Sequence, residues 1–539
     1  MGLLFESLAT DILVAVVSLC IFISWYLNNN YDYWKKRNVP FCKPKPFVGN
    51  FYDRIFFRKS LSEVWQDIYN ELEGEKIGGA WLVREPMLFI RDPEIIKRIL
   101  VKDFAHFQDR GLVVDEKTNP LSAHLFNLGG GRWRALRTKL TPTFTSGKMK
   151  MMFALMSECA HEFCQFVSEE ARATGEVEFK EVLAKFTTDI IGSCAFGLQF
   201  NSMKNPDSEF RAMGRKVFAP SASRTLVGLF FQFAPSLAKV FRLRFPTPEV
   251  SDFFLKAVHD TVEYREKNNI KRNDFLQLLI DLKNKGKIED DHHHHHDAKD
   301  ADNGVAHENG GDVQEFELTT NLLAAQAFVF FLAGFETSST TMSFALHELT
   351  ANPHVQERLR AEIDAVLKET GGQITYEALK KMDYLEMVIN ESLRKYPPVP
   401  VLMRKCNKAY REPETGVLIE EGMRVQIPVY ALHRDPKYYP DPERFDPERF
   451  SEAEKAKRHH YVFLPFGEGP RVCIGLRFGM LQAKLGLATL LSRYELAPSP
   501  RTPHPLTLDP RGFVIACKGG VWVRLTPRKH PAAVATTEL

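Results

Sequence analysis

The sequence predicts a mostly helical protein with a small β lobe near its N-terminal end. Apolar residues follow helical spacing over most of the chain from Arg132 to Arg394. Two short runs with strand character come earlier, Ala80–Arg84 and Met87–Arg91. A length of 539 residues with 44% apolar residues and 41 phenylalanines is enough for one unusually large domain or for several ordinary ones.

Charge and cysteine usage limit the classes of function. A formal net charge of +3 over this length does not indicate a nucleic-acid partner, and the sequence carries no RNA- or DNA-binding motif. The 8 cysteines are scattered without paired spacing. This pattern argues against a disulfide framework and for a body that faces a reducing, cytosolic compartment.

The N-terminal region predicts a membrane anchor within residues 1–30. An almost uncharged run from Ile12 to Leu27 is followed by the basic cluster Lys35–Arg37. With flanking residues, the run approaches the ~20 residues that a helix needs to cross a bilayer. A cleavable signal peptide is the alternative, but it would need a positive n-region and a small-residue cleavage site, and neither is evident. Because the basic cluster follows the run, we expect the body to lie on the cytosolic side.

The remaining boundaries follow from composition. Prolines predict a stiff, non-helical hinge over residues 31–50, and residues 51–527 are expected to form the main domain. The polar segment 283–313 contains the histidine run His292–His296, which could bind metal weakly but which we interpret as a low-complexity surface loop. Residues 528–539 lack periodicity, and we expect a disordered tail there.

One stretch near the C-terminal end combines residues that suit a metal site. Cys473 is surrounded by Gly467, Gly469 and Gly475, and a helix-like apolar pattern begins directly after it. Glycines allow the backbone to turn tightly and to approach a flat, bulky group. A helix N-terminus and the neighbouring Arg471 would favour the thiolate, which is the form that binds soft metals. A buried structural cysteine on a glycine-rich turn is the alternative.

The same stretch carries a family resemblance. The haem-ligand signature of the cytochromes P-450 matches it at Phe466, Gly469, Arg471, Cys473 and Gly475. The sequence therefore resembles that superfamily, whose fold is mostly helical with a small β lobe. The resemblance implies a haem-thiolate catalytic domain in which Cys473 is the axial iron ligand of haem b (iron protoporphyrin IX) and Phe466 contacts the cofactor.

A long apolar helix is predicted from about Glu317 to Thr350, because Pro353 prevents its continuation. By length and composition it could be taken for a second membrane span. The polar side chains of Gln326 and Glu336 argue against that interpretation.

This helix contains the segment Ala333–Thr337, which fits the family motif on the oxygen-binding side of the haem. Gly334 would let the flat macrocycle approach the helix. A threonine hydroxyl that competes for main-chain bonds can open a helix locally and admit water. Thr337 and Glu336 would then form a relay that delivers protons to oxygen. The alternative is a helix whose hydroxyls merely bond to its own carbonyls.

Three charged residues match a structural network of the family. Glu391 and Arg394 lie three positions apart on one helix face, where opposite charges can pair. Such pairs are often solvated surface, but Arg449 in the segment Asp446–Phe450 matches the remaining part of the family pattern. We expect a buried triad that fixes the loop leading to Cys473, and loss of one partner from such a triad is severe.

A tryptophan and several arginines resemble the family's ligands for the haem propionates, anions that planar guanidinium groups suit well. Each of them alone could be surface charge, but together they follow the family order along the chain. They are Trp133, Arg137, Arg404, Arg471 and, as a weaker match, Arg110.

Family position also predicts a substrate pocket that would suit a lipophilic molecule and that includes the loop Leu112–Leu128. Its phenylalanines could equally be ordinary core. The residues expected to line it are those from Phe328 to Ala333, Val399, Val401 and those from Phe513 to Ile515, which include Val514.

The resemblance implies a membrane-bound monooxygenase that inserts one oxygen atom of O₂ into a lipophilic small molecule. Electrons would come from NADPH through NADPH-cytochrome P-450 reductase, with cytochrome b5 as a further candidate partner. The cations between Arg132 and Lys150 would form the docking surface for the reductase. Two alternatives remain: a haem-thiolate isomerase or dehydratase, against which Glu336 and Thr337 argue, and a non-catalytic membrane protein that binds haem and ligand.

Finer details look like insect microsomal members of the xenobiotic-metabolising clan. They are the segments Phe186–Gly197 and Asn205–Arg211. That likeness implies the endoplasmic reticulum membrane as the location and a plant toxin or insecticide as the substrate, with an endogenous lipid or hormone as the alternative.

Overall fold

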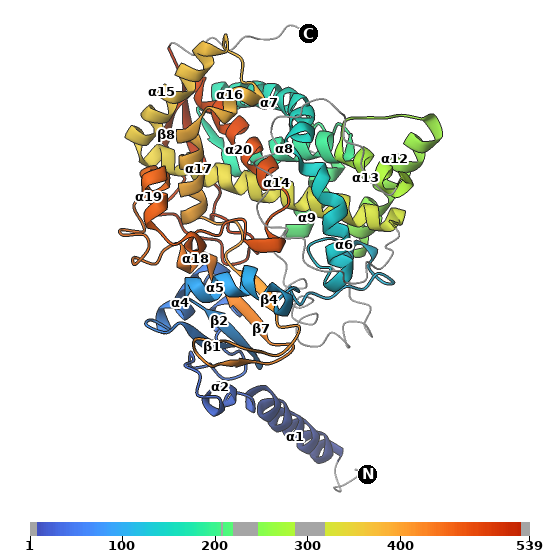
Figure 1. Cartoon of the computed structure of the whole chain (residues 1–539), viewed down its shortest axis with the longest axis vertical. Helices are drawn as coiled ribbons and strands as arrows, with labels where there is room; N and C mark the ends of the chain where they lie inside the picture. The colour runs from blue at the N-terminus through green and yellow to red at the C-terminus, as the bar shows by residue number, and fades with distance from the viewer. Residues whose placement is uncertain (1–7, 206–207, 219–245, 286–317, 530–539) are drawn as a thin grey trace.

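The computed structural model describes residues 8–205, 208–218, 246–285 and 318–529. A large helical body lies above a small sheet lobe, and the long helix α14 (Thr320–Ala351) crosses the helical body. Helix α1 (Leu8–Asn28) projects from the sheet lobe (Figure 1). The prediction of a mostly helical fold with a small β lobe is confirmed.

The sheet lobe brings together segments from both ends of the chain. Its strand order is β1-β2-β7-β4, with β2 and β7 parallel and the other pairs antiparallel. The hairpin β1–β2 falls on the two runs that the sequence assigned to strands, and β4 carries Arg404. The four strands are β1 (Ile77–Leu82), β2 (Glu85–Ile90), β7 (Arg424–Ile427) and β4 (Leu402–Lys405).

The remaining elements either form the helical body or pack against the sheet lobe. An antiparallel sheet with the order β3-β9-β8 and the pair β5–β6 complete the strands. Those strands are β3 (Glu176–Glu178), β8 (Tyr494–Pro498), β9 (Trp522–Pro527), β5 (Tyr410–Arg411) and β6 (Leu418–Ile419). Among the described residues, the other α-helices are α2 (Tyr33–Lys36), α3 (Tyr52–Ile55), α4 (Leu61–Glu71), α5 (Pro93–Lys97), α6 (Gly130–Leu140), α7 (Ser146–Thr174), α8 (Phe179–Ile191), α9 (Glu209–Phe218), α12 (Pro248–Asn268), α13 (Phe275–Lys285), α15 (Pro353–Glu369), α16 (Tyr376–Lys380), α17 (Asp383–Lys395), α18 (Val429–Leu432), α19 (Glu452–Lys457) and α20 (Leu476–Leu491).

Helix α14 is the core helix of the body. The Thr319 hydroxyl caps its first turn by accepting a hydrogen bond from the Leu322 N–H at 3.2 Å, and the helix ends at Ala351, ahead of Pro353. Its 32 residues span about 48 Å at 1.5 Å per residue. The helix packs against α8, α12, α17 and α20, and 61% of its most apolar window is buried. It is therefore an interior helix despite being apolar enough to span a membrane.

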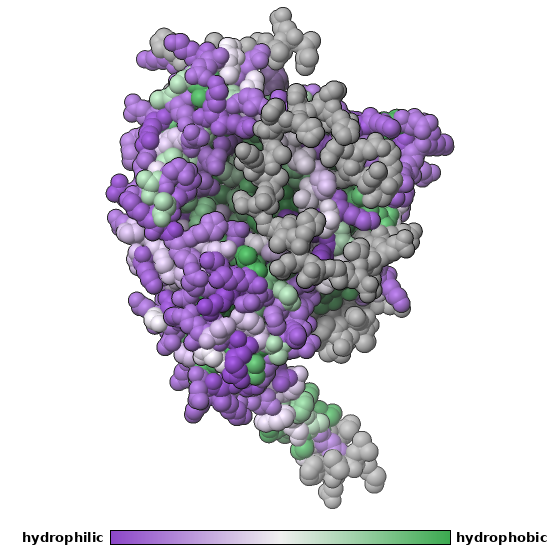
Figure 2. Space-filling model, viewed as in Figure 1, coloured by the Kyte–Doolittle hydropathy of each residue, from purple (hydrophilic) through white to green (hydrophobic). Residues whose placement is uncertain are grey.

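Helix α1 has the opposite character. Its span Ala9–Asn28 also meets the length and composition of a membrane span, but 0% of that window is buried. Figure 2 shows hydrophobic residues exposed along α1, while the body on this face is mostly hydrophilic. Ala9–Asn28 is thus a candidate anchor, and it lies within the predicted residues 1–30.

The segment predicted as a hinge, residues 31–50, is packed against the sheet lobe. Trp34 is 1% exposed, and its indole N–H donates to the Ala80 carbonyl at 3.3 Å. The Cys42 N–H donates to the Gly79 carbonyl at 2.9 Å, and the Gly79 N–H donates to the Pro40 carbonyl at 2.7 Å. The prolines do keep most of the segment non-helical, but its buried aromatic and backbone bonds attach it to β1.

Two predicted boundaries fall partly outside the described residues. Helix α13 continues to Lys285, so the first residues of the predicted loop 283–313 are helical, and residues 286–313 with the histidine run lie outside the described part. At the C-terminal end, the Arg528 guanidinium pairs with Asp364 on α15 and donates to the Leu491 carbonyl at 3.1 Å. The packed chain therefore includes Arg528, where the tail was expected to begin; residues 530–539 lie outside the description.

Candidate active site

A cavity of about 300 Å³ lies where α14, α6, β4 and the loop before α20 meet. Its wall is mainly apolar and contains both Cys473 and Thr337. The structure brings most of the predicted site residues to this wall from distant parts of the sequence. The predicted residues that line it are Arg110, Trp133, Arg137, Ala333, Gly334, Thr337, Val399, Val401, Arg404, Phe466, Arg471 and Cys473.

The loop that carries Cys473 is fixed by its backbone. Gly469 has a φ of +73°, and a Cβ at this position would lie 2.1 Å from the Leu100 carbonyl oxygen. Glycine is required there both by the conformation and by the contact. The Cys473 N–H donates to the Phe466 carbonyl at 2.9 Å, and α20 begins three residues later at Leu476. The cysteine is thus held on a tight turn directly before a helix.

The surroundings of Cys473 do not favour the thiolate in the way the sequence suggested. Its exposed surface lies in the cavity. Burial raises the pKa of the Cys473 thiol, and this effect outweighs the Gly475 N–H and the charges of Arg137 and Arg110, which lower it. The expectation that Arg471 favours the thiolate is wrong, because that side chain contacts backbone carbonyls instead. Deprotonation would come from coordination by a metal, which removes the proton of a bound thiol.

Four guanidinium groups converge on the cavity: those of Arg110, Arg137, Arg404 and Arg471. Arg404 and Arg471 are 2% and 3% exposed. The buried atoms Arg404 Nε and Arg471 Nη1 have no hydrogen-bond partner among the described residues. Burial lowers the pKa of Arg404 to about 10, and burial together with the charge of Arg404 lowers the pKa of Arg471 to about 9.

This donor set fits an anionic cofactor. Buried charges are normally paired, so unpaired guanidinium donors on residues that line one cavity indicate acceptors with negative charge. Arg471 also stacks over the ring of Trp133, with 4.1 Å between the guanidinium carbon and the ring centroid. Two carboxylates on a flat macrocycle, as in haem b, would satisfy these donors while its iron meets Cys473.

Gly334 lines the cavity, but the structural reason for glycine differs from the prediction. A Cβ at this position would lie 2.2 Å from Cδ1 of Ile191 on α8. The missing side chain therefore permits the close packing of α8 on α14. Approach of a macrocycle to the backbone of Gly334 is not what this contact requires.

The predicted relay residues point in different directions. Thr337 lines the cavity, and its hydroxyl donates to the Ala333 carbonyl at 2.6 Å. The Glu336 carboxylate does not line the cavity and pairs with Lys180 Nζ at 2.8 Å. Consecutive helical residues are separated by about 100° around the axis, which explains the divergence. Helix α14 is uninterrupted, so the predicted local opening is not observed, and the alternative of a hydroxyl bonded to its own helix describes Thr337 here.

Lys180 is a residue that the sequence reasoning missed. Its amine also donates to the hydroxyls of Thr340 at 2.7 Å and Ser339 at 3.2 Å. Because Lys180 lies on α8, some 156 positions from Glu336, no local spacing could indicate the pair. The contact follows from the packing of α8 against α14.

The predicted substrate pocket is partly wrong. Phe328 faces away from the cavity and packs on Phe254, with ring centroids 5.0 Å apart. Phe513 is 50% exposed and Val514 is buried elsewhere, so neither lines the cavity. The helical period would have excluded Phe328 from the predicted pocket, because positions 330, 333, 337 and 341 share one face of α14. Leu125 and Phe126 of the predicted loop and Val329 and Phe330 of the predicted stretch Phe328 to Ala333 do line the cavity. Lining residues that the prediction missed include Phe144, Ile191, Cys194, Phe275 and Met480.

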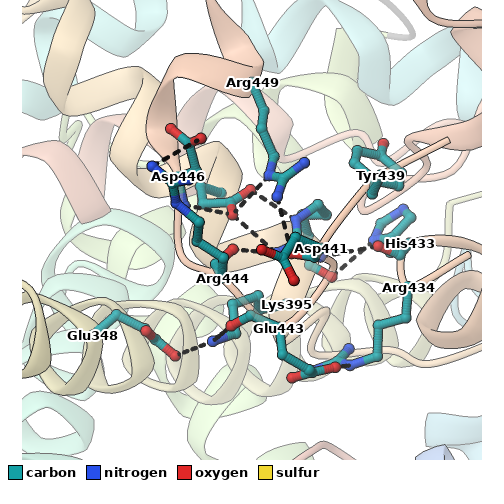
Figure 3. A network of polar contacts seen from close by, with 12 residues as sticks. Glu348, Lys395, His433, Arg434, Tyr439, Asp441, Glu443, Arg444, Asp446 and Arg449 are labelled. Carbon is teal, nitrogen blue, oxygen red and sulfur yellow. Dashed lines mark hydrogen bonds and ion pairs between the residues drawn. The ribbon is translucent and has the colours of Figure 1, made fainter. Parts of the chain in front are cut away.

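Glu391, Arg394 and Arg449 lie together behind the cysteine loop. The Glu391 carboxylate accepts from Arg394 Nε at 2.7 Å and from Arg394 Nη2 at 2.9 Å, and Arg449 Nε is 3.6 Å away. Glu391 and Arg394 are each 0% exposed. Figure 3 shows Arg449 and Asp446 at this network, and the Asp446 N–H donates to Glu391 at 2.9 Å.

His433 connects this network to the cysteine loop and was also missed. Arg394 Nη1 donates to the His433 carbonyl at 3.0 Å. The His433 Nε2 in turn accepts from the Leu464 N–H at 2.9 Å, immediately before the cysteine loop. Burial and the charge of Arg394 lower the pKa of His433 to about 3, so the ring is neutral and can accept. A continuous path of bonds therefore runs from α17 to the loop that holds Cys473.

A family model described as Cytochrome P450 matches residues 39–523. Cytochrome P450 6k1 of Blattella germanica is 43% identical over 511 residues, which cover 95% of this chain and 96% of that protein. Cytochrome P450 6a2 of Drosophila melanogaster is 43% identical over 522 residues, covering 95% and 98%. Cytochrome P450 9e2 of Blattella germanica is 40% identical over 532 residues, covering 95% and 97%.

Proposed function

The chain belongs to the cytochrome P450 family, and from this premise we propose that it oxygenates a lipophilic small molecule in the cavity beside Cys473. Family membership makes it a haem-containing monooxygenase. The observation that supports this cavity as the site is the meeting of Cys473 with unpaired, buried guanidinium donors on one apolar wall. The similarity to insect proteins supports a xenobiotic, such as a plant toxin or insecticide, as the substrate; an endogenous lipid or hormone is the alternative.

Each part of the wall has a distinct task in this proposal. Cys473 would supply the sulfur ligand of the iron, and Trp133, Arg137, Arg404 and Arg471 would hold the propionates. When bound, the haem supplies the reductive activation of dioxygen and the transfer of one oxygen atom to the substrate. The apolar wall excludes water and orients the substrate. Val399 and Val401 support this role, because both contribute apolar surface to the same cavity.

We place the proton-donating hydroxyl at Thr337, whose side chain opens onto the cavity. Glu336 would contribute protons only after its carboxylate leaves Lys180, since the ion pair holds it outside the cavity. Lys180 therefore controls whether the acid is available to the threonine.

Replacing Thr337 with alanine is expected to uncouple the enzyme. Without the hydroxyl, no positioned group would deliver protons to dioxygen. Peroxide released per NADPH consumed should therefore rise several-fold. The measurement is peroxide and product yield at equal NADPH consumption. Ser343→Ala is the matched control, because Ser343 also bonds to a carbonyl of α14 but does not line the cavity. Unchanged coupling in Thr337→Ala would refute the role of this hydroxyl.

The electron donor that we propose is NADPH-cytochrome P450 reductase, with cytochrome b5 as a second candidate. Exposed cations at Arg134 and Lys150 support docking of an acidic partner next to α6. Turnover of a lipophilic test substrate should require both NADPH and the reductase, and its rate should fall as ionic strength rises. Conversion of a substrate without NADPH would favour isomerase or dehydratase chemistry, and ligand binding without any turnover would favour a binding protein.

We propose that α1 anchors the protein in the endoplasmic reticulum membrane with its body on the cytosolic face. Deleting residues 1–30 is expected to reduce greatly the fraction that sediments with membranes, because the exposed apolar helix is lost. The measurement is the distribution between pellet and supernatant after an alkaline wash, alongside the haem content of each fraction. Full retention in the pellet would show that another surface provides the attachment.

A further inference from the structure

Asp109 lies beside the guanidinium cluster and has no role in the family signature described above. Its carboxylate Oδ1 accepts from the Gly130 N–H at 2.8 Å, and Oδ2 accepts from the Asn407 side-chain amide at 2.7 Å. The same Oδ1 is 3.7 Å from Arg471 Nη2. Its side chain is 26% exposed, whereas that of Arg471 is 0% exposed. Asp109 is therefore a fixed carboxylate at the edge of the cluster.

The contacts of Asp109 reach three elements that carry cluster residues. Gly130 is the first residue of α6, which bears Trp133 and Arg137. Arg471 belongs to the cysteine loop. On the third side, the Lys405 N–H donates to the Asp109 carbonyl at 2.7 Å, directly after Arg404 on β4.

The N-terminus of α6 depends on this carboxylate. Gly129 is the residue that precedes the helix, and it has no side chain that could accept from the first turn. A Cβ at Gly129 would lie 2.5 Å from Asp109 Oδ1, so glycine makes room for the distant carboxylate. A negative charge at a helix N-terminus is favourable.

Arg471 is likewise oriented on several sides. Its Nε donates to the Gln108 carbonyl at 2.6 Å, and its Nη2 donates to the Leu128 carbonyl at 2.7 Å. Gln108 directly precedes Asp109, and Leu128 directly precedes Gly129, so both carbonyls lie next to the residues discussed above. Nη1 is left free of protein partners among the described residues. The carboxylate and the two carbonyls thus fix the guanidinium on the Nε and Nη2 sides.

We propose that Asp109 is a positioning residue of the haem site. Its carboxylate holds α6 and Arg471 in one geometry and offsets part of the positive charge that faces the propionates. The inference rests on the proposed haem site, but it makes a separate claim about one acid. Removing its charge would favour the ferrous state, because that state carries one more electron than the ferric state.

The test compares two substitutions at this position in the full chain. Asp109→Asn retains an oxygen for the Gly130 N–H and removes the charge. In this variant the equilibrium ratio of ferrous to ferric haem should rise by about three- to tenfold. A tenfold rise corresponds to an increase of about 59 mV in the one-electron reduction potential. Asp109→Ala also removes the acceptor for α6, and haem transfer to excess apomyoglobin should become several-fold faster than in wild type.

Asp103→Asn is the matched control. Asp103 is also partly buried and also accepts a side-chain bond, from the Tyr410 hydroxyl at 2.7 Å. Its substitution should leave the potential and the transfer rate at wild-type values. Asn407→Ala is a further test variant, because it removes the hydrogen bond to Asp109 Oδ2 without changing the charge. This variant should also accelerate haem transfer.

The outcomes separate this inference from the proposed haem site. A wild-type chain that is folded but binds no haem refutes the haem site itself. Holoprotein of Asp109→Asn with wild-type potential, or Asp109→Ala with a wild-type transfer rate, refutes the role of Asp109. A potential shift of equal size in Asp103→Asn also refutes it. If the Asp109 variants do not fold, Asn407→Ala decides, and an unchanged transfer rate there overturns the inference.

Discussion

Replacing Cys473 with alanine is expected to abolish the strongly red-shifted Soret band that carbon monoxide produces with reduced, thiolate-ligated haem. The substitution removes the sulfur that faces the cavity, while the backbone bond from residue 473 to the Phe466 carbonyl can persist. The fold should therefore survive even though the ligand is lost. The measurement is the carbon monoxide difference spectrum of the dithionite-reduced protein, together with haem content and thermal unfolding.

Cys194 provides a matched control for this prediction because it is a second cysteine on the wall of the same cavity. It is 1% exposed, and its thiol is directed to the Met152 carbonyl at 3.7 Å. Cys194→Ala should retain the band. Retention of the band in Cys473→Ala would refute the ligand assignment, and its loss in Cys194→Ala alone would transfer the assignment to Cys194.

The features that the sequence predicted well are those encoded in short spacings. The cysteine loop needs glycine at positions such as Gly469, so the requirement is visible in the sequence itself. Glu391 and Arg394 are one helical turn apart, and their pairing follows from helix geometry. Membership in the P450 family and the mostly helical fold could be inferred from these stretches without knowledge of the packing.

Side-chain direction was harder to predict, for two different reasons. The prediction that the whole stretch Phe328 to Ala333 lines the pocket ignored the helical period, which puts Phe330, and not Phe328, on the face of Ala333 and Thr337. Glu336 was assigned to the relay because it is adjacent to Thr337 in sequence, although adjacency on a helix separates side chains. Both errors could have been avoided from the sequence alone.

Contacts between distant segments could not be derived in this way. Most of the contacts described for Lys180, His433 and Asp109 join residues more than twenty positions apart in the sequence. No spacing rule connects such residues. The exposed position of Phe513 likewise depends on how its loop packs. A charged residue that supports a site from another element becomes visible only when the elements are assembled.

Arg394→Ala is expected to yield little folded holoprotein. Arg394 makes two bonds to Glu391 and donates to the carbonyls of His433 and Arg444. Arg394, Glu391 and His433 are each 0% exposed. Burial lowers the pKa of Arg394, but the Glu391 carboxylate raises it, and the resulting pKa lies above its ordinary value. Removing one partner of a buried pair costs about 3–5 kcal/mol, a large part of the ~5–15 kcal/mol that typically stabilises a protein. Haem content per folded protein and the free energy of unfolding are the measurements.

Two further variants distinguish loss of a buried charge from loss of a specific geometry. Arg358→Ala removes an exposed ion pair with Glu448, and exposed pairs contribute only about 0–1 kcal/mol, so haem content should remain normal. The double substitution Glu391→Leu with Arg394→Met removes both buried charges and should recover part of the stability. It should not recover haem binding, because the bond from Arg394 to the His433 carbonyl, and through His433 to Leu464, is absent. Normal haem content in Arg394→Ala would show that the cysteine loop does not depend on the triad. Full haem binding in the double variant would show that charge balance, rather than the bonded path to Leu464, is what the loop requires.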